Sequence, residues 1–375
     1  MKICFWGNIA CALMGNTDGG GELQIAYLAI ELARGGHEVV IIDYNITEDF
    51  ITDDGIKIFK INGWNNGIRI IRTFTHRLPQ LYWSLKAQKA NVYYSRIRDF
   101  RHILAFWAAH KVKAKFILGL ASDLDAMNFV MRLKYQHRVS FDGLWSLSNG
   151  ILIEIIYPWL LRKADIVFVQ HEGQRQILLQ KHIISIVFPN LIDLTQIPVI
   201  SNQIKNDFIY VGSLDKRKGF AEFFEVIKKA PLHSYKVVGQ PRGNTGYLYY
   251  ERLKSFKNVS LLGRLSHSDT IYQIKNSKAL ISTSRMEGFP NVFIEAWACG
   301  IPVLSLYVDP GSIIKKEELG EVSQGNLDKL IQVMELKKNQ NELAKRAKIY
   351  VEHNHAINAT KIKEISNLFN ELCNY

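Results

Sequence analysis

Two glutamates stand out in the stretch SRMEGFPNVFIEAWACGIPVL, which covers residues 284–304 and is otherwise largely apolar. Glu287 precedes a Gly-Phe-Pro sequence, and Glu295 follows eight positions later. A carboxylate among apolar residues needs a partner, because burying an isolated charge is costly. Ionised carboxylates only accept hydrogen bonds, so the two glutamates suit hydroxyl groups such as those of a sugar or a ribose.

The elements around these glutamates place the first one at the end of a strand. The residues ALISTS predict a strand and PNVFIEAWAC a helix, with Pro290 in its first turn and Gly300 after its end. Glu287 then lies in the loop, beside amides of a helix N-terminus that can receive a phosphate. These amides belong to Gly288, Phe289, Asn291 and Val292. With Glu295 on a ribose diol and Glu287 on a sugar, the segment predicts a site for a nucleotide that carries a sugar.

A capping box is the structural alternative for the first glutamate, because Ser284 and Glu287 have the required spacing. That arrangement would put Pro290 inside the helix, at a cost of about 3 kcal/mol. The binding role is therefore the favoured interpretation of Glu287.

A basic loop follows the strand predicted at DFIYVGS, where the residues SLDKRKG bring Lys216, Arg217 and Lys218 into one turn. A lysine cluster of this kind can be a solvated turn without a ligand. Its position at the carboxyl end of a strand favours a second role, in which the cations neutralise a diphosphate. The loop therefore predicts a diphosphate subsite in which these cations take the place of a metal ion.

Two loops in the first half of the chain are weaker candidates. In GNTDGGGELQ, three consecutive glycines let the backbone approach a ligand ahead of a helix, although the GxGxxG spacing of dinucleotide-binding proteins is absent. Asp123 and Asp125 follow the strand predicted at KFILGLA. Either aspartate can cap a helix, and Asp123 can alternatively orient or deprotonate an acceptor hydroxyl.

The elements that position these loops repeat one pattern in both halves of the chain. Apolar runs such as EVVIID, ADIVFVQ, DFIYVGS and IPVLSL alternate with amphipathic segments, which predicts parallel sheets with helices on both faces. The run PNLIDLTQIPVISNQIKN interrupts this pattern with prolines and turn formers. We predict an α/β protein with two Rossmann-like, doubly wound domains facing a cleft. Residues 1–195 form the acceptor-side domain, residues 196–355 the nucleotide-sugar domain, and residues 356–375 a closing helix that can pack back on the first domain.

The composition is that of a globular protein with an anionic partner. The formal net charge is +12, which fits phosphorylated metabolites, acidic membranes or nucleic acid, but no nucleic-acid-reading motif is present. The four cysteines lack a CxxC or zinc spacing and are expected to be reduced thiols of a cytoplasmic protein. No apolar run is long enough to span a bilayer. Residues 127–163 mix aromatic and basic residues, which fits either an anionic membrane surface or an ordinary helix pair.

The order of these segments resembles glycosyltransferase family 4, whose members are retaining enzymes of the GT-B fold. The resemblance rests on the glycine loop, the VGSLDKRKG loop and the Glu-x7-Glu element, and it covers nearly the whole chain. It implies that Glu295 binds the ribose, that Glu287 contacts the donor sugar and that Lys218 holds the diphosphate. It also implies donor contacts from three glycines, of which the last lies near the base: Gly20, Gly21 and Gly239.

Two departures from the family pattern affect the expected site. Many members carry an arginine where this chain has Ser213, five residues before Lys218. The cations that can replace it are Lys216, Arg217 and Arg242. Members also often show a histidine near the position of Asp123, which weakens the assignment of Asp123 as the acid or base.

The expected reaction is transfer of a hexosyl group from a nucleotide diphosphate sugar to a hydroxyl acceptor, with the retention that the resemblance implies. The preferred acceptor is a glycan or lipid-linked glycan of surface polysaccharide biosynthesis, at the inner face of the membrane. Neither a cofactor nor a metal ion is expected, because cations and helix dipoles stabilise the leaving diphosphate. The alternatives are a nucleotide-sugar epimerase of similar fold and a non-catalytic nucleotide-sugar-binding subunit.

Overall fold

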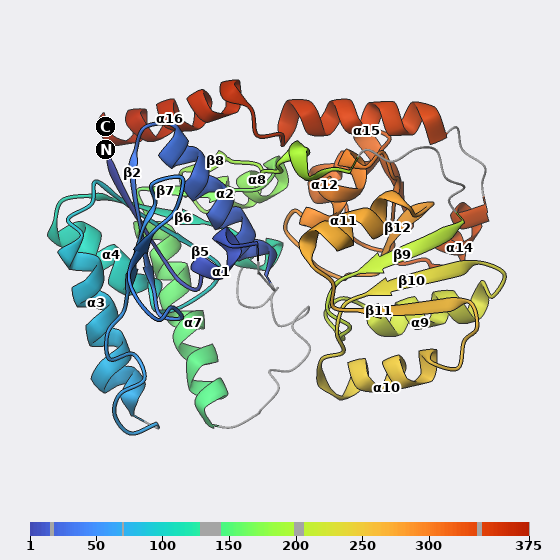
Figure 1. The fold of residues 1–375 in the computed structure, drawn as a ribbon, viewed down its shortest axis with the longest axis horizontal. Helices are drawn as coiled ribbons and strands as arrows, with labels where there is room; N and C mark the ends of the chain where they lie inside the picture. The colour runs from blue at the N-terminus through green and yellow to red at the C-terminus, as the bar shows by residue number, and fades with distance from the viewer. Residues whose placement is uncertain (16–18, 70, 128–143, 199–205, 336–339, 375) are drawn as a thin grey trace. The chain divides into compact units, whose positions relative to one another are not determined.

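The computed structural model of this chain describes residues 1–15, 19–69, 71–127, 144–198, 206–335 and 340–374 (Figure 1). The chain divides into two compact units, Met1–Leu191 with Ile357–Tyr375, and Ile192–Ala356. The sequence places the boundary after residue 195, a few residues later than the division in the structure.

In the described part of the chain, the first unit is built on a sheet of eight strands. Neighbouring strands are parallel except for β3 and β4, which are antiparallel. The strands predicted at EVVIID, KFILGLA and ADIVFVQ form β2, β6 and β7. Across the sheet the order is β3 (Phe50–Ile51), β4 (Lys57–Lys60), β2 (Glu38–Asp43), β1 (Lys2–Trp6), β5 (Val92–Arg96), β6 (Lys115–Gly119), β7 (Ile166–Val169) and β8 (Ser185–Val187).

Helices cover both faces of this sheet, because alternate residues of each strand point to opposite sides. Cys4 and Trp6 of β1 belong to a core with α3, α4 and α7, whereas Ile3 and Phe5 belong to a second core with α2 and α16. The helices are α1 (Ala10–Leu13), α2 (Gly20–Arg34), the π-helical η1 (Thr73–Arg77), α3 (Leu78–Ala87), α4 (His102–Lys111), α5 (Asp123–Ala126), α7 (Leu144–Lys163), α8 (Glu172–Leu179) and α16 (Ala359–Asn374).

Helix α7 forms part of the segment that the sequence presents as a membrane surface or a helix pair. Residues 128–143 of that segment lie outside the described residues. The helix carries Pro158 in its interior and packs on α4. Within the described ranges, no helix is both long and apolar enough to cross a membrane.

The second unit contains a six-stranded parallel sheet in the described residues. Its order is β11 (Val259–Gly263), β10 (Ser234–Val238), β9 (Asp207–Val211), β12 (Ala279–Ser282), β13 (Val303–Ser305) and β14 (Gly320–Val322). The longer helices of this unit are α9 (Phe220–Lys229), α10 (Gly243–Leu253), α11 (His267–Lys275), α12 (Asn291–Ala298), α14 (Leu327–Glu335) and α15 (Gln340–Asn354). Its short helices are η2 (Leu194–Gln196), η3 (Pro310–Ser312) and α13 (Ile313–Lys316). The strand order is that of a doubly wound nucleotide-binding sheet.

The closing stretch forms two helices, where the sequence shows one continuous helical pattern. Helix α15 packs on α12 in the second unit, and α16 packs on α2 in the first. Residues 355–358 separate them, and Ile192 pairs with Ala356 in this stretch. Asn358 caps α16, because its Oδ1 accepts a hydrogen bond from the Lys361 amide at 2.9 Å. The Ser366 hydroxyl of α16 lies 2.8 Å from His37 Nε2 in the first unit.

Candidate active site

The winding of the second sheet brings together the loops at the carboxyl ends of β9 and β12, and we call the place between these loops the crevice. The chain runs outward from β9 to β10 and β11, and then returns to β12 on the other side of β9. Ala279 and Leu280 of β12 pair with Phe208 and Ile209 of β9, so the loops that follow both strands emerge side by side. In doubly wound sheets, ligands bind at this kind of switch point.

An ion pair joins the two loops at this crevice. Lys218, in the loop after β9, places its Nζ 2.5 Å from Oε1 of Glu287, in the loop after β12. The two side chains are 26% and 19% exposed, so a ligand can reach them. The sequence predicts both residues for one site, and the structure brings them together.

Hydrogen bonds hold the backbone of the Lys218 loop. The Asp215 carboxylate accepts from the Lys218 amide at 2.9 Å and from the Ser213 hydroxyl at 2.7 Å. Thr283, next to β12, donates its hydroxyl to the Gly219 carbonyl at 2.7 Å. Ser213 therefore positions Asp215, and it does not supply the positive charge of the arginine that the resemblance leads one to expect at this position.

Gly219 is required where the two loops meet. Its backbone is left-handed, with φ of 68°, and a Cβ there would come within 2.0 Å of the Thr283 carbonyl oxygen. Glycine tolerates this conformation without steric cost and leaves room for the carbonyl. The close approach of these two loops therefore depends on a residue without a side chain.

Helix α12 begins one residue later than the sequence predicts. Pro290 is its N-cap rather than a first-turn residue, and the helix starts at Asn291, followed by Val292. The capping-box alternative is wrong, because Ser284 and Glu287 both precede this N-cap. The N-terminal end of α12, with its partial positive charge, follows Gly288 after two intervening residues, Phe289 and Pro290.

Phe289 contributes to the core beneath this loop. Its ring is 3% exposed and makes edge contacts with Trp297 and His355 at centroid distances of 6.1 and 4.9 Å. Any ligand contact from this residue therefore comes from its backbone, as the sequence interpretation assumed. The buried ring fixes the loop that carries Glu287.

Glu295 has a partner that sequence reasoning missed. Its carboxylate is nearly buried, and its Oε1 lies 3.0 Å from Nε2 of His267, the first residue of α11. His267 Nδ1 lies 3.1 Å from Oε1 of Gln196. The hydrogen bond to Glu295 raises the pKa of His267 above its ordinary value, although burial acts in the opposite direction. The raised pKa favours the protonated ring, in which both nitrogens donate.

Two further predicted residues of the second unit have different surroundings. Gly239 follows β10 with φ of 141°, and a Cβ there would come within 1.8 Å of the Gly212 carbonyl oxygen. This position therefore requires glycine for packing between two loops of the crevice. Arg217 is exposed next to Lys218, and Arg242 is the exposed N-cap of α10.

The predicted glycines of the first unit open a helix. Gly20 and Gly21 are the first two residues of α2, behind the N-cap Gly19. A Cβ on Gly21 would approach the Ile97 side chain, which follows β5, to 2.8 Å. The glycines therefore allow α2 to begin close to the carboxyl ends of β1 and β5.

Asp123 accepts two hydrogen bonds and does not cap the helix. Ser122 and Asp125 form the capping box of α5, so the capping alternative is wrong for Asp123. The Asp123 Oδ1 lies 2.9 Å from His171 Nε2 and accepts from Gln174 Nε2 at 2.9 Å. His171 follows β7, the neighbour of β6, and comes from 48 residues away in the sequence. A carboxylate that orients a histidine is a common acid–base arrangement.

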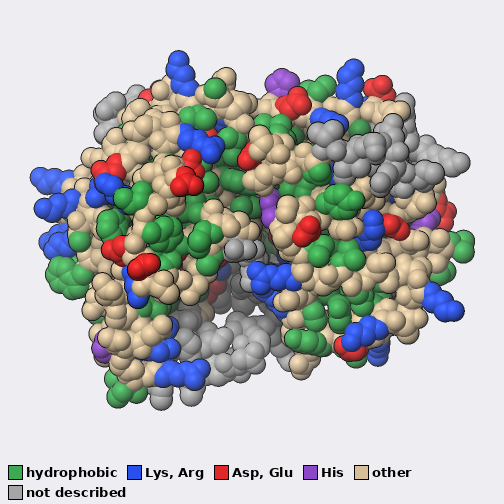
Figure 2. Space-filling model, viewed as in Figure 1, with side chains coloured by type: hydrophobic (Ala, Val, Ile, Leu, Met, Phe, Trp, Pro, Cys, Tyr) green, Lys and Arg blue, Asp and Glu red, His purple; other side chains and the backbone are tan. Residues whose placement is uncertain are grey.

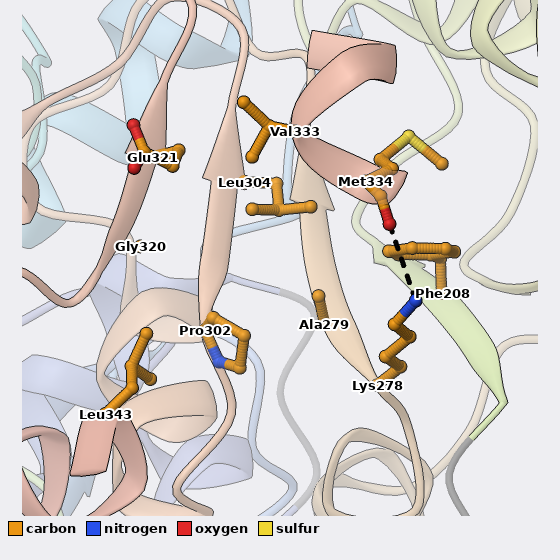
Figure 3. A pocket seen from close by; sticks show the side chains of 10 residues that line it. All are labelled: Phe208, Lys278, Ala279, Pro302, Leu304, Gly320, Glu321, Val333, Met334 and Leu343. Atoms are coloured by element: carbon orange, nitrogen blue, oxygen red, sulfur yellow. Dashed lines mark hydrogen bonds between the residues drawn. The ribbon is translucent and has the colours of Figure 1, made fainter. Parts of the chain in front are cut away.

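A cavity in the second unit lies away from these residues. Figure 3 shows it at the amino ends of β9, β12, β13 and β14, lined mainly by apolar side chains such as Phe208, Leu304 and Met334. Lys278, which also lines the cavity, donates to the Met334 carbonyl at 3.4 Å. None of the predicted site residues lines this cavity, so it is not the site described above.

Sequence comparisons agree with the chemistry of the crevice. Residues 197–350 match the family Glycosyl transferases group 1. An uncharacterized glycosyltransferase of Haemophilus influenzae is 23% identical over 340 residues, which are 87% of this chain and 88% of that protein. Another, from Methanocaldococcus jannaschii, is 26% identical over 184 residues, so that match spans 43% of this chain and only 45% of the archaeal protein.

Solved structures share the fold. Sucrose-phosphate synthase from Thermosynechococcus elongatus matches with a TM-score of 0.76 and 16% identity over 99% of both chains. HepE of Anabaena, solved with UDP-glucose, matches with a TM-score of 0.69 and 13% identity over 99% of this chain and all of that one. These structures confirm the predicted α/β architecture of the GT-B type. Together with the family match, they support a glycosyltransferase.

Proposed function

We propose that this protein is a retaining glycosyltransferase that moves a hexosyl group from a nucleotide diphosphate sugar to a hydroxyl acceptor. The observation that carries the proposal is the Lys218–Glu287 pair at the crevice, beside the N-terminal end of α12. A cation, a carboxylate and a helix N-terminus are the groups that a sugar diphosphate needs for its phosphates and its hydroxyls.

Donor binding would exchange the partners of this ion pair. The Lys218 ammonium passes from the Glu287 carboxylate to the anionic diphosphate, and Glu287 becomes free to accept hydrogen bonds from the sugar hydroxyls. Lys216 and Arg217 lie in the same loop and can share the phosphate charge. The pair thus keeps both groups satisfied until the donor arrives.

The chemical step breaks the bond between the anomeric carbon and the diphosphate oxygen, and the electron pair leaves with the diphosphate. Positive charge develops on the sugar, while negative charge grows next to Lys218 and the α12 N-terminus, which lowers the barrier. The acceptor oxygen bonds to the anomeric carbon on the same face. Its proton passes to the departing phosphate oxygen, so retention needs neither a protein nucleophile nor a cofactor or metal ion.

Glu295 would bind the ribose hydroxyls with its carboxylate held by His267. This places the nucleoside toward α11 and the diphosphate toward the β9 loop of the same unit. Gly239, at the end of the intervening strand β10, is the predicted neighbour of the base. UDP is the first nucleotide to test, because the similar HepE was solved with UDP-glucose.

The acceptor is proposed to be a glycan or lipid-linked glycan of surface polysaccharide biosynthesis, reached from the cytoplasmic face of an anionic membrane. In the first unit, Asp123 and His171 are the groups proposed to orient the acceptor hydroxyl. The charge of +12 supports an anionic surface as partner.

Transfer of radiolabelled sugar tests this function. Label that moves from UDP-glucose or a related donor to an added glycan, with retained configuration, supports the proposal. If the label stays in the nucleotide sugar and the configuration of the labelled sugar changes at another carbon, the protein is an epimerase. Donor binding without any turnover on acceptor glycans or lipid extracts indicates a nucleotide-sugar-binding subunit.

A further inference from the structure

The positive charge of the chain is concentrated in one segment. Residues 55–122 contain thirteen lysines and arginines and a single acidic residue, Asp99. Their formal net charge of +12 equals that of the whole chain, so the remaining residues carry equal numbers of both signs. This segment includes α3 and α4 of the first unit.

Three helices of this unit share a tryptophan near their C-terminal ends. Trp83 of α3, Trp107 of α4 and Trp159 of α7 each stand four residues before the last residue of their helix. Their side chains are 59%, 47% and 39% exposed. A cation follows each tryptophan three or four positions later, on the same helix face: Lys86, Lys111 and Arg162.

The three tryptophans lie along one edge of the sheet. Each helix leads directly into a strand, and these strands, β5, β6 and β7, are parallel neighbours. The C-terminal ends of the helices therefore share the edge where the strands begin. Helix α4 contacts both α3 and α7, and Phe106 of α4 meets the Trp159 ring at a centroid distance of 5.1 Å. In Figure 2, lysine and arginine side chains gather at the left edge of the view, by α4 of Figure 1.

Exposed isoleucines extend this surface along α7. Ile151 and Ile155 stand eight and four positions before Trp159, on the same side of the helix, and are 51% and 66% exposed. We call the surface formed by Trp83, Trp107, Ile151, Ile155 and Trp159 the tryptophan face. An exposed apolar patch of this kind marks a contact surface.

Carboxylates near the tryptophan face already pair with cations of this unit. Helices α3 and α4 contain none, and Glu154 of α7 pairs with Arg98 at 2.7 Å. Asp165, at the same edge, accepts from the Phe116 amide at 2.8 Å and lies 3.7 Å from Lys115. Cations at helix C-termini also stabilise the helix dipole, but that role explains neither the exposed tryptophans nor the isoleucines.

We propose that the tryptophan face docks on an anionic lipid bilayer. Tryptophan prefers the boundary between acyl chains and headgroups, and lysine or arginine one turn away reaches the phosphates. The Lys86 ammonium already lies 4.8 Å from the Trp83 ring centroid, so ring and cation form one amphipathic unit. The inference rests on the membrane association within the proposed function, but not on its sugar chemistry.

Vesicle co-sedimentation of the full chain tests the docking. Wild-type protein is expected to bind phosphatidylcholine vesicles that contain phosphatidylglycerol, and to bind vesicles of phosphatidylcholine alone only weakly. High salt should abolish the binding. Replacing the three tryptophans by serine (Trp83→Ser, Trp107→Ser, Trp159→Ser), or reversing the cations (Lys86→Glu, Lys111→Glu, Arg162→Glu), should each weaken binding at least about tenfold.

A control in the second unit separates this surface from general stickiness. Leu232 is 97% exposed, and Leu232→Ser with Lys345→Glu should leave lipid binding unchanged. Nucleotide binding, measured without lipid, shows whether each variant is folded and tests the proposed function separately. Equal lipid binding by all variants, or no lipid binding by the wild type, overturns the docking. The docking is also overturned if the wild type forms dimers and binds no lipid, while the tryptophan variant is monomeric.

Discussion

The two sheets are wound alike, yet they hold different charge pairs beyond the carboxyl ends of their strands. Both sheets place their first strand beside the strand that begins the second half of the winding, β1 beside β5 and β9 beside β12. After β5 the pair is Arg101 with Asp99, and after β9 and β12 it is Lys218 with Glu287. Under the proposed function, the first pair is structural and the second exchanges its partner for a phosphate, so one winding can serve both roles.

The pair in the first unit is fixed by several contacts. Arg101 Nε lies 2.9 Å from both oxygens of Asp99, and its guanidinium lies over the rings of Trp6, Tyr44 and Trp64. Burial raises the pKa of Asp99, but the hydrogen bonds and charge of Arg101 outweigh it, so this pKa lies below its ordinary value. Lys218 instead contacts one oxygen of Glu287, an arrangement that a phosphate can replace.

The largest expected effect comes from breaking the exchangeable pair. Lys218→Ala should lower the rate of sugar transfer by about 100- to 1000-fold, because the leaving diphosphate loses its cation. Lys257→Ala, which changes an exposed lysine in the turn before β11, is the control and should retain most of the activity. Initial rates with labelled donor compare the two, and equal rates would show that the pair is only structural.

The backbone beneath the pair should be the next most sensitive feature. Gly219→Ala forces a side chain against the Thr283 carbonyl and should lower the free energy of unfolding by about 2–4 kcal/mol. Gly243 has a similar φ of 64° but open space around a Cβ, so Gly243→Ala should cost only about 1 kcal/mol. Urea unfolding of both variants measures the difference. Similar costs would mean that the loops relax around a side chain.

Breaking the pair of the first unit should affect stability. Arg101→Gln leaves Asp99 without its cation and removes the ring contacts, which should cost about 1–3 kcal/mol of unfolding free energy. Arg175→Gln, which breaks a pair whose side chains are half exposed, should cost less than about 0.5 kcal/mol. Nucleotide affinity is expected to remain in both variants. A stable Arg101→Gln protein that no longer transfers sugar would instead assign Arg101 to the acceptor.

The smallest expected effect is a pH dependence from His267. Because Glu295 raises the pKa of His267, the stabilisation is complete below the ordinary histidine pKa and is lost as pH rises through the raised value. Wild-type protein should lose at most about 1 kcal/mol of unfolding free energy over this range relative to His267→Ala. His353→Ala, an exposed histidine of α15, should behave as the wild type. If the unfolding free energies of all three proteins change in parallel with pH, the His267–Glu295 pair does not contribute a charge interaction to stability.

The sequence predicts more of the fold than of the contacts. Each apolar run that it marks as a strand forms one, whereas β14 has the sequence Gly-Glu-Val and shows no apolar run that would mark it. Pro290 suits both a first turn and an N-cap, so spacing alone misplaces the start of α12. The split between α15 and α16 coincides with the Asn358 cap and with the pairing of Ala356 with the distant Ile192, which no local pattern shows.

Partners of the site residues were harder to predict because they come from distant loops. Lys218 and Glu287 were both predicted, but their pairing depends on the adjacency of β9 and β12, which no local pattern specifies. His267 lies 28 residues from Glu295, and His171 lies 48 from Asp123. Both histidines stand at the start of a helix that follows a strand. This position was the available signal that they could lie near the predicted carboxylates.

Calorimetric titration of nucleotide sugars tests the central claim most directly. The wild type and Lys257→Ala should bind one of UDP-, GDP- or ADP-glucose or a related conjugate. Lys218→Ala and Glu295→Ala should bind it at least about tenfold more weakly, as expected for the loss of a charged contact to a phosphate or a ribose. Failure of the folded wild type to bind any nucleotide sugar, or equal affinity in all variants, would contradict the assignment of the β9–β12 crevice as the donor site.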